Sequence, residues 1–130
     1  MKEFMFLIRN TLNHQDEWSD DKLREFLKKC EVYIEELKSQ GKLLSAQPLI
    51  REGIILSGKK GAWKEVPFNE IDEVQMGYYH ILANDMEEAI TIAKQNPEFE
   101  YGSTARIEVR PIKTKEVTTE FVYPRTTLSS

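Results

Sequence analysis

The sequence is poor in cysteine and histidine and has no long hydrophobic run. Cys30 is its single cysteine, which excludes an internal disulfide and therefore a secreted, disulfide-stapled framework. His14 and His80 lie far apart and no short histidine or carboxylate motif accompanies them, so we expect neither a metal site nor a cofactor. No apolar stretch approaches the ~20 residues of a membrane-spanning helix, so a membrane is not an expected partner.

Charge and the start of the chain narrow the function classes further. The net charge of −4 gives no attraction toward phosphate backbones, so nucleic acid is not an expected partner either. Near the N-terminus, the apolar run 4–8 is bounded by Glu3 and Arg9 and lacks the long uncharged core of a signal peptide. A soluble protein of the cytoplasm is the simplest interpretation.

Length and composition predict one folded domain. The chain has 130 residues, of which 40% are hydrophobic and 31% are charged, as in ordinary globular proteins. A chain of this length buries enough surface for a single hydrophobic core. We place the domain at residues 1–112 and treat 113–130 as a C-terminal tail that either adds a strand or crosses to a partner chain.

Hydrophobic periodicity predicts the order of the elements. Strands are expected at 2–9, 43–49, 53–57, 74–83 and 105–112, with 43–49 and 53–57 lying around one turn. The segment 57–63 is predicted to form a hairpin loop, and 66–73 a stiff loop led by Pro67.

Two amphipathic helices are predicted between these strands. The first starts at Ser19 or Asp20 and ends at Gly41, and its apolar stripe contains Leu23, Phe26, Leu27, Cys30, Ile34 and Leu37. The second covers 84–97 and starts with a capping-box-like pattern of Asp85 and Glu88.

This order is typical of the α+β, ferredoxin-like split βαβ arrangement, with two helices on one face of an antiparallel sheet. Strict alternation in 74–83 gives two apolar faces: Met76, Tyr78 and Leu82 on one, and Tyr79, Ile81 and Ala83 on the other. Two helices cover only one face of such a sheet. We therefore expect a second subunit over the other face, in a homodimer.

Several blocks of the sequence together resemble the YCII-related family, and specifically its DGPF branch. The blocks are "MKEFMFLIRN", "GKLLSAQPL", "PFNEIDEVQMGYYHI", "MEEAITIAKQNP" and "IEVRPI". They occur in the family's order and span residues 1–112. Glu65-Val66 stands where the branch has Asp-Gly, and Asp72-Glu73 where it has Lys-Glu. The sequence identifies no counterpart of the histidine–aspartate pair that some family members carry.

The resemblance implies a ferredoxin-like domain that dimerises as an α+β barrel, with a cleft between the sheet and the partner. It also implies that function in this branch is largely unassigned. Proteins of related branches are linked to lyase, isomerase or dehalogenation chemistry on small ring compounds, and some are encoded beside regulatory sigma factors.

His80 is the one chemically ambiguous residue of the strand 74–83. It is predicted to share a face with Tyr78, and it could act as a general base or bind a carboxylate. The alternative is a histidine that is hydrogen-bonded at the sheet or the dimer interface. His14 is expected to be solvent-exposed in a polar loop, and Cys30 to be a buried, inert thiol.

The last strand carries alternating charges. Arg106, Glu108 and Arg110 are predicted to project from one face, opposite Ile107 and Val109. Arg106 and Arg110, which flank Glu108, could hold a carboxylate ligand, and Arg9 at the end of the first strand could join them. Tyr78 could line an aromatic cavity. The alternative is a ladder of ion pairs across the sheet or the interface.

Three functions remain open from the sequence. The first is the binding of a small organic molecule in the cleft of a dimeric α+β barrel. The second is a lyase- or isomerase-type enzyme in which His80 is the base and an arginine holds a substrate anion. The third is a regulatory or interaction protein that binds no ligand.

Overall fold

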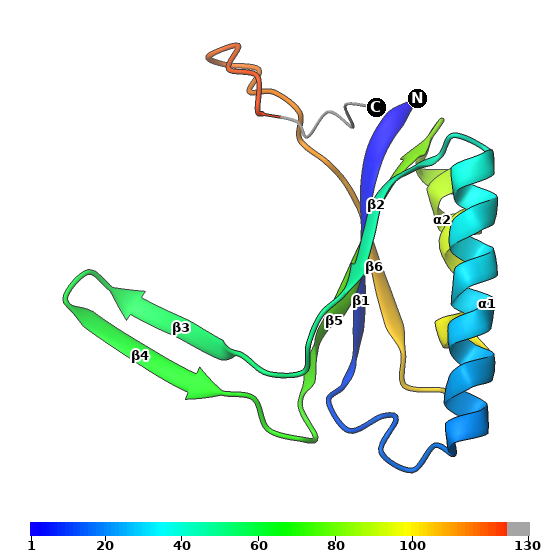
Figure 1. Cartoon of the computed structure of the whole chain (residues 1–130). Helices are drawn as coiled ribbons and strands as arrows, with labels where there is room; N and C mark the ends of the chain where they lie inside the picture. The colour runs from blue at the N-terminus through cyan, green and yellow to red at the C-terminus, as the bar shows by residue number, and fades with distance from the viewer. Residues whose placement is uncertain (125–130) are drawn as a thin grey trace.

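Four antiparallel strands form the main sheet in a computed structural model, which describes residues 1–124 (Figure 1). They are β1 (Lys2–Thr11), β2 (Leu43–Pro48), β5 (Glu73–Ala83) and β6 (Arg106–Pro111), in the spatial order β2-β5-β1-β6. The two central strands are therefore the first strand and the strand 74–83, as in a ferredoxin-like fold. The predicted α+β class is confirmed.

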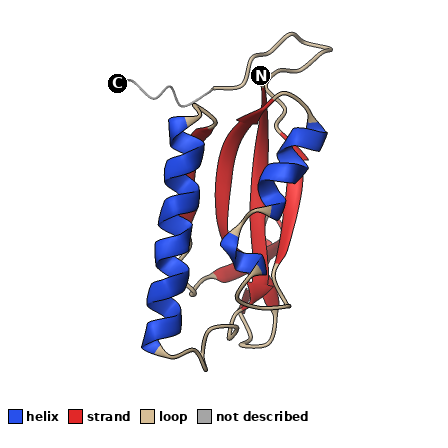
Figure 2. Cartoon of the chain, turned by 90° about the vertical axis from the view of Figure 1, so that its right-hand side faces the viewer, coloured by secondary structure: helices blue, strands red, loops and turns tan. Residues whose placement is uncertain are grey.

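Both helices cover the same face of this sheet (Figure 2). They are α1 (Asp20–Ser39) and α2 (Met86–Lys94), and a short 3-10 helix, η1 (Pro97–Phe99), follows α2. The predicted caps are formed: Ser19 Oγ accepts from Lys22 N at 3.1 Å, and Asp85 Oδ1 accepts from Glu88 N at 2.9 Å. Gly41 follows α1 with a φ of +69°, a conformation that glycine adopts without strain.

The core lies between the helices and the sheet. Phe4, Phe6 and Ile8 alternate along β1 and are buried against the helices. From α1, Tyr33 reaches the same cluster, and its hydroxyl donates to Ile92 O at 2.8 Å, which fastens α1 to α2. The predicted stripe of α1 omitted Tyr33 and included Leu27, which is exposed.

The middle of the chain pairs differently from the prediction. The segments 43–49 and 53–57 do not lie around one turn, because β2 pairs with β5 whereas β3 (Ile54–Lys59) pairs with β4 (Ala62–Pro67). The hairpin predicted at 57–63 exists, but Lys60 and Gly61 alone join its strands, and Val66 and Pro67 belong to β4 instead of a loop. Periodicity alone does not identify which strands pair.

The β3–β4 hairpin projects away from the sheet on the side opposite the helices (Figure 1). Every residue of its two strands is exposed. The pairing of Gly58 with Trp63 places Trp63 on the same hairpin face as Ile54 and Leu56. These three side chains are 60%, 56% and 61% exposed, respectively, so the hairpin carries an uncovered apolar face.

A β-bulge interrupts the pairing of β1 with β5. Ile8 pairs with Gly77 and Arg9 pairs with Gln75, which leaves Met76 without an opposite residue. Met76 lines a cavity beneath α1, whose lining also includes Tyr78, and the bulge interrupts the strict alternation that the sequence predicts at this point. The other face assignments in this strand hold: Ile81 and Ala83 are buried with the core.

The tail leaves β6 on the same side as the hairpin (Figure 1). Within 113–124 it forms a turn closed by one bridge between Lys115 and Val122, and this part adds no strand to the main sheet. Phe121, Val122 and Val117 are exposed. The predicted tail also includes 125–130, which lie outside the described residues.

His14 is half-buried, which corrects the prediction of an exposed histidine. Its ring lies edge-on to Trp18, and Nδ1 is 2.9 Å from Thr11 O. Because a carbonyl oxygen only accepts, Nδ1 carries the proton and Nε2 holds the lone pair. Burial is the main cause that lowers the pKa of His14. Nε2 is buried without a partner, so a second proton there would have no acceptor.

Stability is therefore expected to fall on mild acidification. The folded chain resists protonation of His14, whereas the unfolded chain takes up the proton near the ordinary pKa of about 6.5. Protons then favour the unfolded state as the pH falls through this value. The free energy of unfolding, measured with urea, should fall more between pH 7.5 and pH 5.5 for the wild type than for His14→Asn. The amide nitrogen of the asparagine replaces Nδ1 as the donor. Equal losses in both proteins would contradict the assignment.

Candidate functional site

The sheet face opposite the helices, here called the open face, carries five of the residues that the sequence singles out. By register and alternation they are Arg9 of β1, Tyr78 and His80 of β5, and Glu108 and Arg110 of β6. Met5, Leu7 and Leu82 provide apolar surface among them. The structure places these residues on one face but spreads them between its two ends.

One end of the open face holds a histidine–carboxylate pair. His80 Nε2 lies 2.7 Å from Glu3 Oε1, and the two side chains are only 22% and 8% exposed. Because the carboxylate accepts the Nε2 proton in neutral His80, the lone pair then lies on Nδ1. This arrangement orients the ring and favours Nδ1 as the proton acceptor in any acid–base reaction.

The pair lies in the wall of a cavity beside the tail. This tail-side cavity has a volume of about 620 Å³, and its lining includes Lys2, Lys113 and Tyr123 as well as Glu3 and His80. The volume lies within the range of small-molecule sites in proteins. The lining thus has two ammonium groups against the Glu3 carboxylate, and Lys113 is also 2.9 Å from Glu116, so the balance of charge favours an anionic ligand only slightly.

Arg110 lies near His80 across the sheet. Both residues pair with Met5, from opposite sides, so the three side chains form one row on the open face. Two strand spacings separate Arg110 from His80, roughly 10 Å between backbones. Arg110 also contacts Glu108 at 3.5 Å, a long and exposed ion pair that contributes little stability.

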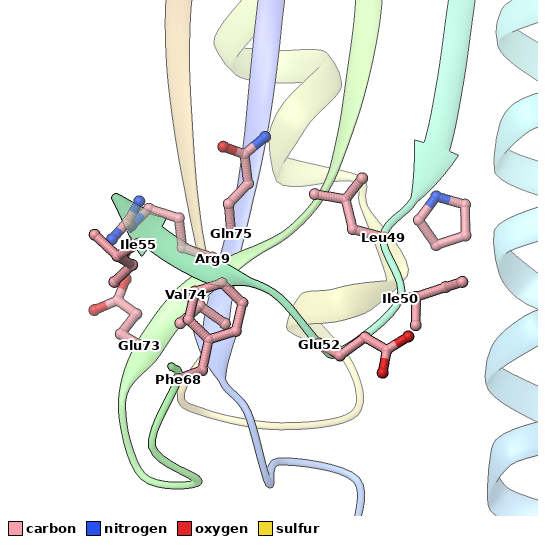
Figure 3. Close-up of a pocket in the computed structure, with 10 residues that line it drawn as sticks. Arg9, Leu49, Ile50, Glu52, Ile55, Phe68, Glu73, Val74 and Gln75 are labelled. Atoms are coloured by element: carbon pink, nitrogen blue, oxygen red, sulfur yellow. Dashed lines mark hydrogen bonds and ion pairs between the residues drawn. The ribbon is translucent and has the colours of Figure 1, made fainter. Parts of the chain in front are cut away.

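Arg9 lies at the other end of the open face, where charged side chains form ion pairs across the sheet. Its Nε donates to Glu73 Oε1 at 3.2 Å, and Arg106 donates to Glu73 Oε2 at 3.1 Å. Arg9 and Glu73 border a second cavity of about 710 Å³ between the sheet and the base of the hairpin, with Phe68 and Ile55 on its hairpin side (Figure 3). Arg9 and His80 therefore do not meet in one cavity.

Glu3 is the residue of this candidate site that sequence reasoning missed. In the sequence it reads as a charge that interrupts the apolar start of the chain, whereas the structure makes it the partner of His80. Glu3 pairs with Leu82 and Met5 pairs with His80, so Glu3 and His80 are diagonal neighbours on the open face. Diagonal neighbours on one face are within reach of long side chains. Finding the contact required the pairing of β1 with β5.

Cys30 is half-buried, and burial is the main cause that raises the pKa of its thiol to about 12. The thiolate nucleophile is therefore scarce at neutral pH, as expected for an inert cysteine. Among residues 1–124, no cluster of three or more histidine, cysteine or acidic side chains could hold a metal ion. Neither helix in this part of the chain combines the length and apolar composition needed to cross a bilayer.

Comparison with known proteins identifies the family of the chain. The family model of the YCII-related domain matches residues 3–113, from the first strand to just past β6. The curated proteins include no match for the chain. The family match does not distinguish the DGPF branch, so this part of the resemblance stays a prediction. With most of its length covered by the model, the chain belongs to the YCII-related domain family.

Proposed function

We propose that the protein is a homodimer that binds a small organic acid over the open face of its sheet, at the end that holds His80. The observation that carries this proposal is the pair of Glu3 and His80 in the wall of the tail-side cavity. Location in the cytoplasm stays a prediction from the sequence.

The two projecting arms support the dimer. The hairpin and the tail leave the sheet on the side of the open face and flank it at its two ends (Figure 1). Each arm exposes apolar side chains, among them Trp63 and Phe121. A two-stranded hairpin alone is only marginally stable in water, and a second copy over the open face would cover these side chains.

Charge supports the ligand class. Lys2 and Lys113 line the tail-side cavity, and Arg110 is in the same row as His80. The guanidinium of Arg110 offers parallel donors that match a carboxylate. Met5 between Arg110 and His80 gives an apolar floor for the body of a small ligand. A small carboxylate that also carries a ring or a carbonyl group fits these contacts.

A second candidate function, proton transfer, is favoured by the orientation of His80. In this reaction Nδ1 of His80 takes a proton from the carbon next to a ligand carbonyl, and the electron pair of the C–H bond forms an enolate. The imidazolium then returns a proton to the same carbon, which restores the carbonyl group. Glu3 acts as a positioning residue through its bond to Nε2.

Levulinate, a small keto acid, tests both candidates. In deuterated buffer, the wild type should accelerate exchange of the protons next to the keto group, measured by proton NMR. His80→Gln is expected to lower this rate by about 10²- to 10⁴-fold, the usual contribution of a general base. Glu3→Gln should lower kcat with little change in KM, and Glu3→Asp should recover part of the loss.

Arg106→Gln is the matched control, because Arg106 is on the same face at the far end and pairs with Glu73. It should leave exchange unchanged, whereas Arg110→Gln should raise KM. Saturable levulinate binding without exchange would contradict proton transfer and retain the binding function. If neither levulinate nor benzoate binds saturably, both the binding function and the proton-transfer function are overturned. A regulatory or interaction protein is then favoured.

A further inference from the structure

A third cavity lies on the opposite side of the sheet from the Glu3–His80 pair, between α1 and the strands β2 and β5. It has a volume of about 350 Å³, within the range of small-ligand sites. Its wall is mainly apolar, formed by Ile8, Leu27, Ile34, Ala46 and Met76. We call it the helix-side cavity.

Two departures from the expected packing make this space. The β-bulge turns Met76 toward α1, and Leu27 lies at the cavity while remaining 55% exposed. The predicted stripe of α1 is therefore not fully covered by the chain's own sheet. An apolar molecule in the cavity would cover Leu27 and fill the space beside Cys30.

The charged groups of this cavity all have one sign. Its lining contains three carboxylates, those of Glu31, Glu35 and Glu98, and none of the described residues that line it is basic. Glu31 and Glu35 are one helical turn apart on α1, and Glu98 approaches from η1. An anionic ligand would be repelled, and a cation would be attracted.

Glu98 is the carboxylate best placed for a direct contact. It is half-buried, and desolvation by burial is the main cause that raises its pKa, partly offset by the charge of Arg51. Its backbone N–H donates to Asn96 Oδ1 at 2.9 Å, which fixes the segment that carries it. A cationic donor beside Glu98 would compensate the desolvated carboxylate. Tyr79 also lines this cavity, and burial raises the pKa of its hydroxyl.

We propose that the helix-side cavity binds a small organic amine, with an apolar or aromatic body against Ile34 and Met76 and its ammonium group at Glu98. This site prefers the opposite charge to the site proposed on the open face and is separated from it by the sheet. Evidence against one site therefore does not count against the other.

The four methionines report where a ligand binds. Met76 lines the helix-side cavity, Met5 is on the open face, Met1 lines the tail-side cavity, and Met86 begins α2. In protein labelled with ¹³C at the methionine methyl groups, phenethylamine should shift the Met76 signal saturably and leave Met5 unchanged. Phenylacetate, with the same ring and a negative charge, should not shift Met76.

Glu98→Gln keeps the size of the side chain and removes its charge. It is expected to weaken phenethylamine binding about tenfold or more, the usual effect of losing one charged hydrogen bond. Glu100→Gln is the matched control, because Glu100 is two residues further, pairs with Lys29 and is outside the cavity lining. It should bind the amine as the wild type does.

Three results would overturn the proposal. One is that millimolar phenethylamine causes no saturable shift of the Met76 signal, in labelled protein whose thermal stability equals that of the unlabelled protein. Another is a shift of Met76 by phenylacetate equal to that by the amine. The third is equal amine affinity of wild type and Glu98→Gln. A shift of Met5 by levulinate would be unaffected by any of these, so failure here is distinguishable from failure of the proposed function.

Discussion

Phe6→Ala is expected to lower the free energy of unfolding by about 3–5 kcal/mol, the cost of removing a fully buried phenylalanine. Phe6 is 0% exposed at the centre of β1, and its ring lies 6.3 Å from that of Tyr79. Small domains are stable by only about 5–15 kcal/mol, so this loss is a large share of the total. Urea unfolding at one fixed protein concentration measures it, because a dimer's stability depends on concentration.

Val32→Ala is the control for this experiment. Val32 is also an apolar residue, but it is 52% exposed on α1. Its replacement should change stability by no more than about 0.5 kcal/mol. Similar losses in both variants would mean that the helices do not cover the Phe6 side of the sheet, and the fold described above would be wrong.

Leu56→Asp combined with Trp63→Asp is expected to convert the protein to a monomer. Both side chains lie on the apolar face of the hairpin, which we place in the dimer interface. Loss of an interface anchor costs about 2 kcal/mol or more, so two such losses raise the dissociation constant on the order of 10³-fold. Light scattering at micromolar concentration should give the mass of one chain for the variant and of two chains for the wild type.

The same two aspartates on the other face of the hairpin provide the control. Ser57 and Lys64 pair with each other and alternate with Leu56 and Trp63. Ser57→Asp combined with Lys64→Asp should therefore leave the dimer intact. A wild-type monomer would refute the dimer outright. Dissociation by both pairs of substitutions would show that the hairpin matters through its folding or charge, and not through its apolar face.

Features that depend on neighbouring residues were predictable from the sequence. The apolar run of the first strand, the caps at Ser19 and Asp85, and the stop at Gly41 each arise within a few residues. Alternation within each strand also placed Tyr78 with His80, and Glu108 with Arg110. Local sequence carries these signals because strand and helix periods are fixed by backbone geometry.

The sequence by itself thus determined the two helices, the four strands of the main sheet and the family. Tertiary structure alone decided that β2 pairs with β5, that Met76 occupies a bulge, and that Glu3 meets His80. Those features depend on which strands become neighbours and in what register. Glu3 and His80 are 77 positions apart in the chain, and periodicity carries no information over such a separation.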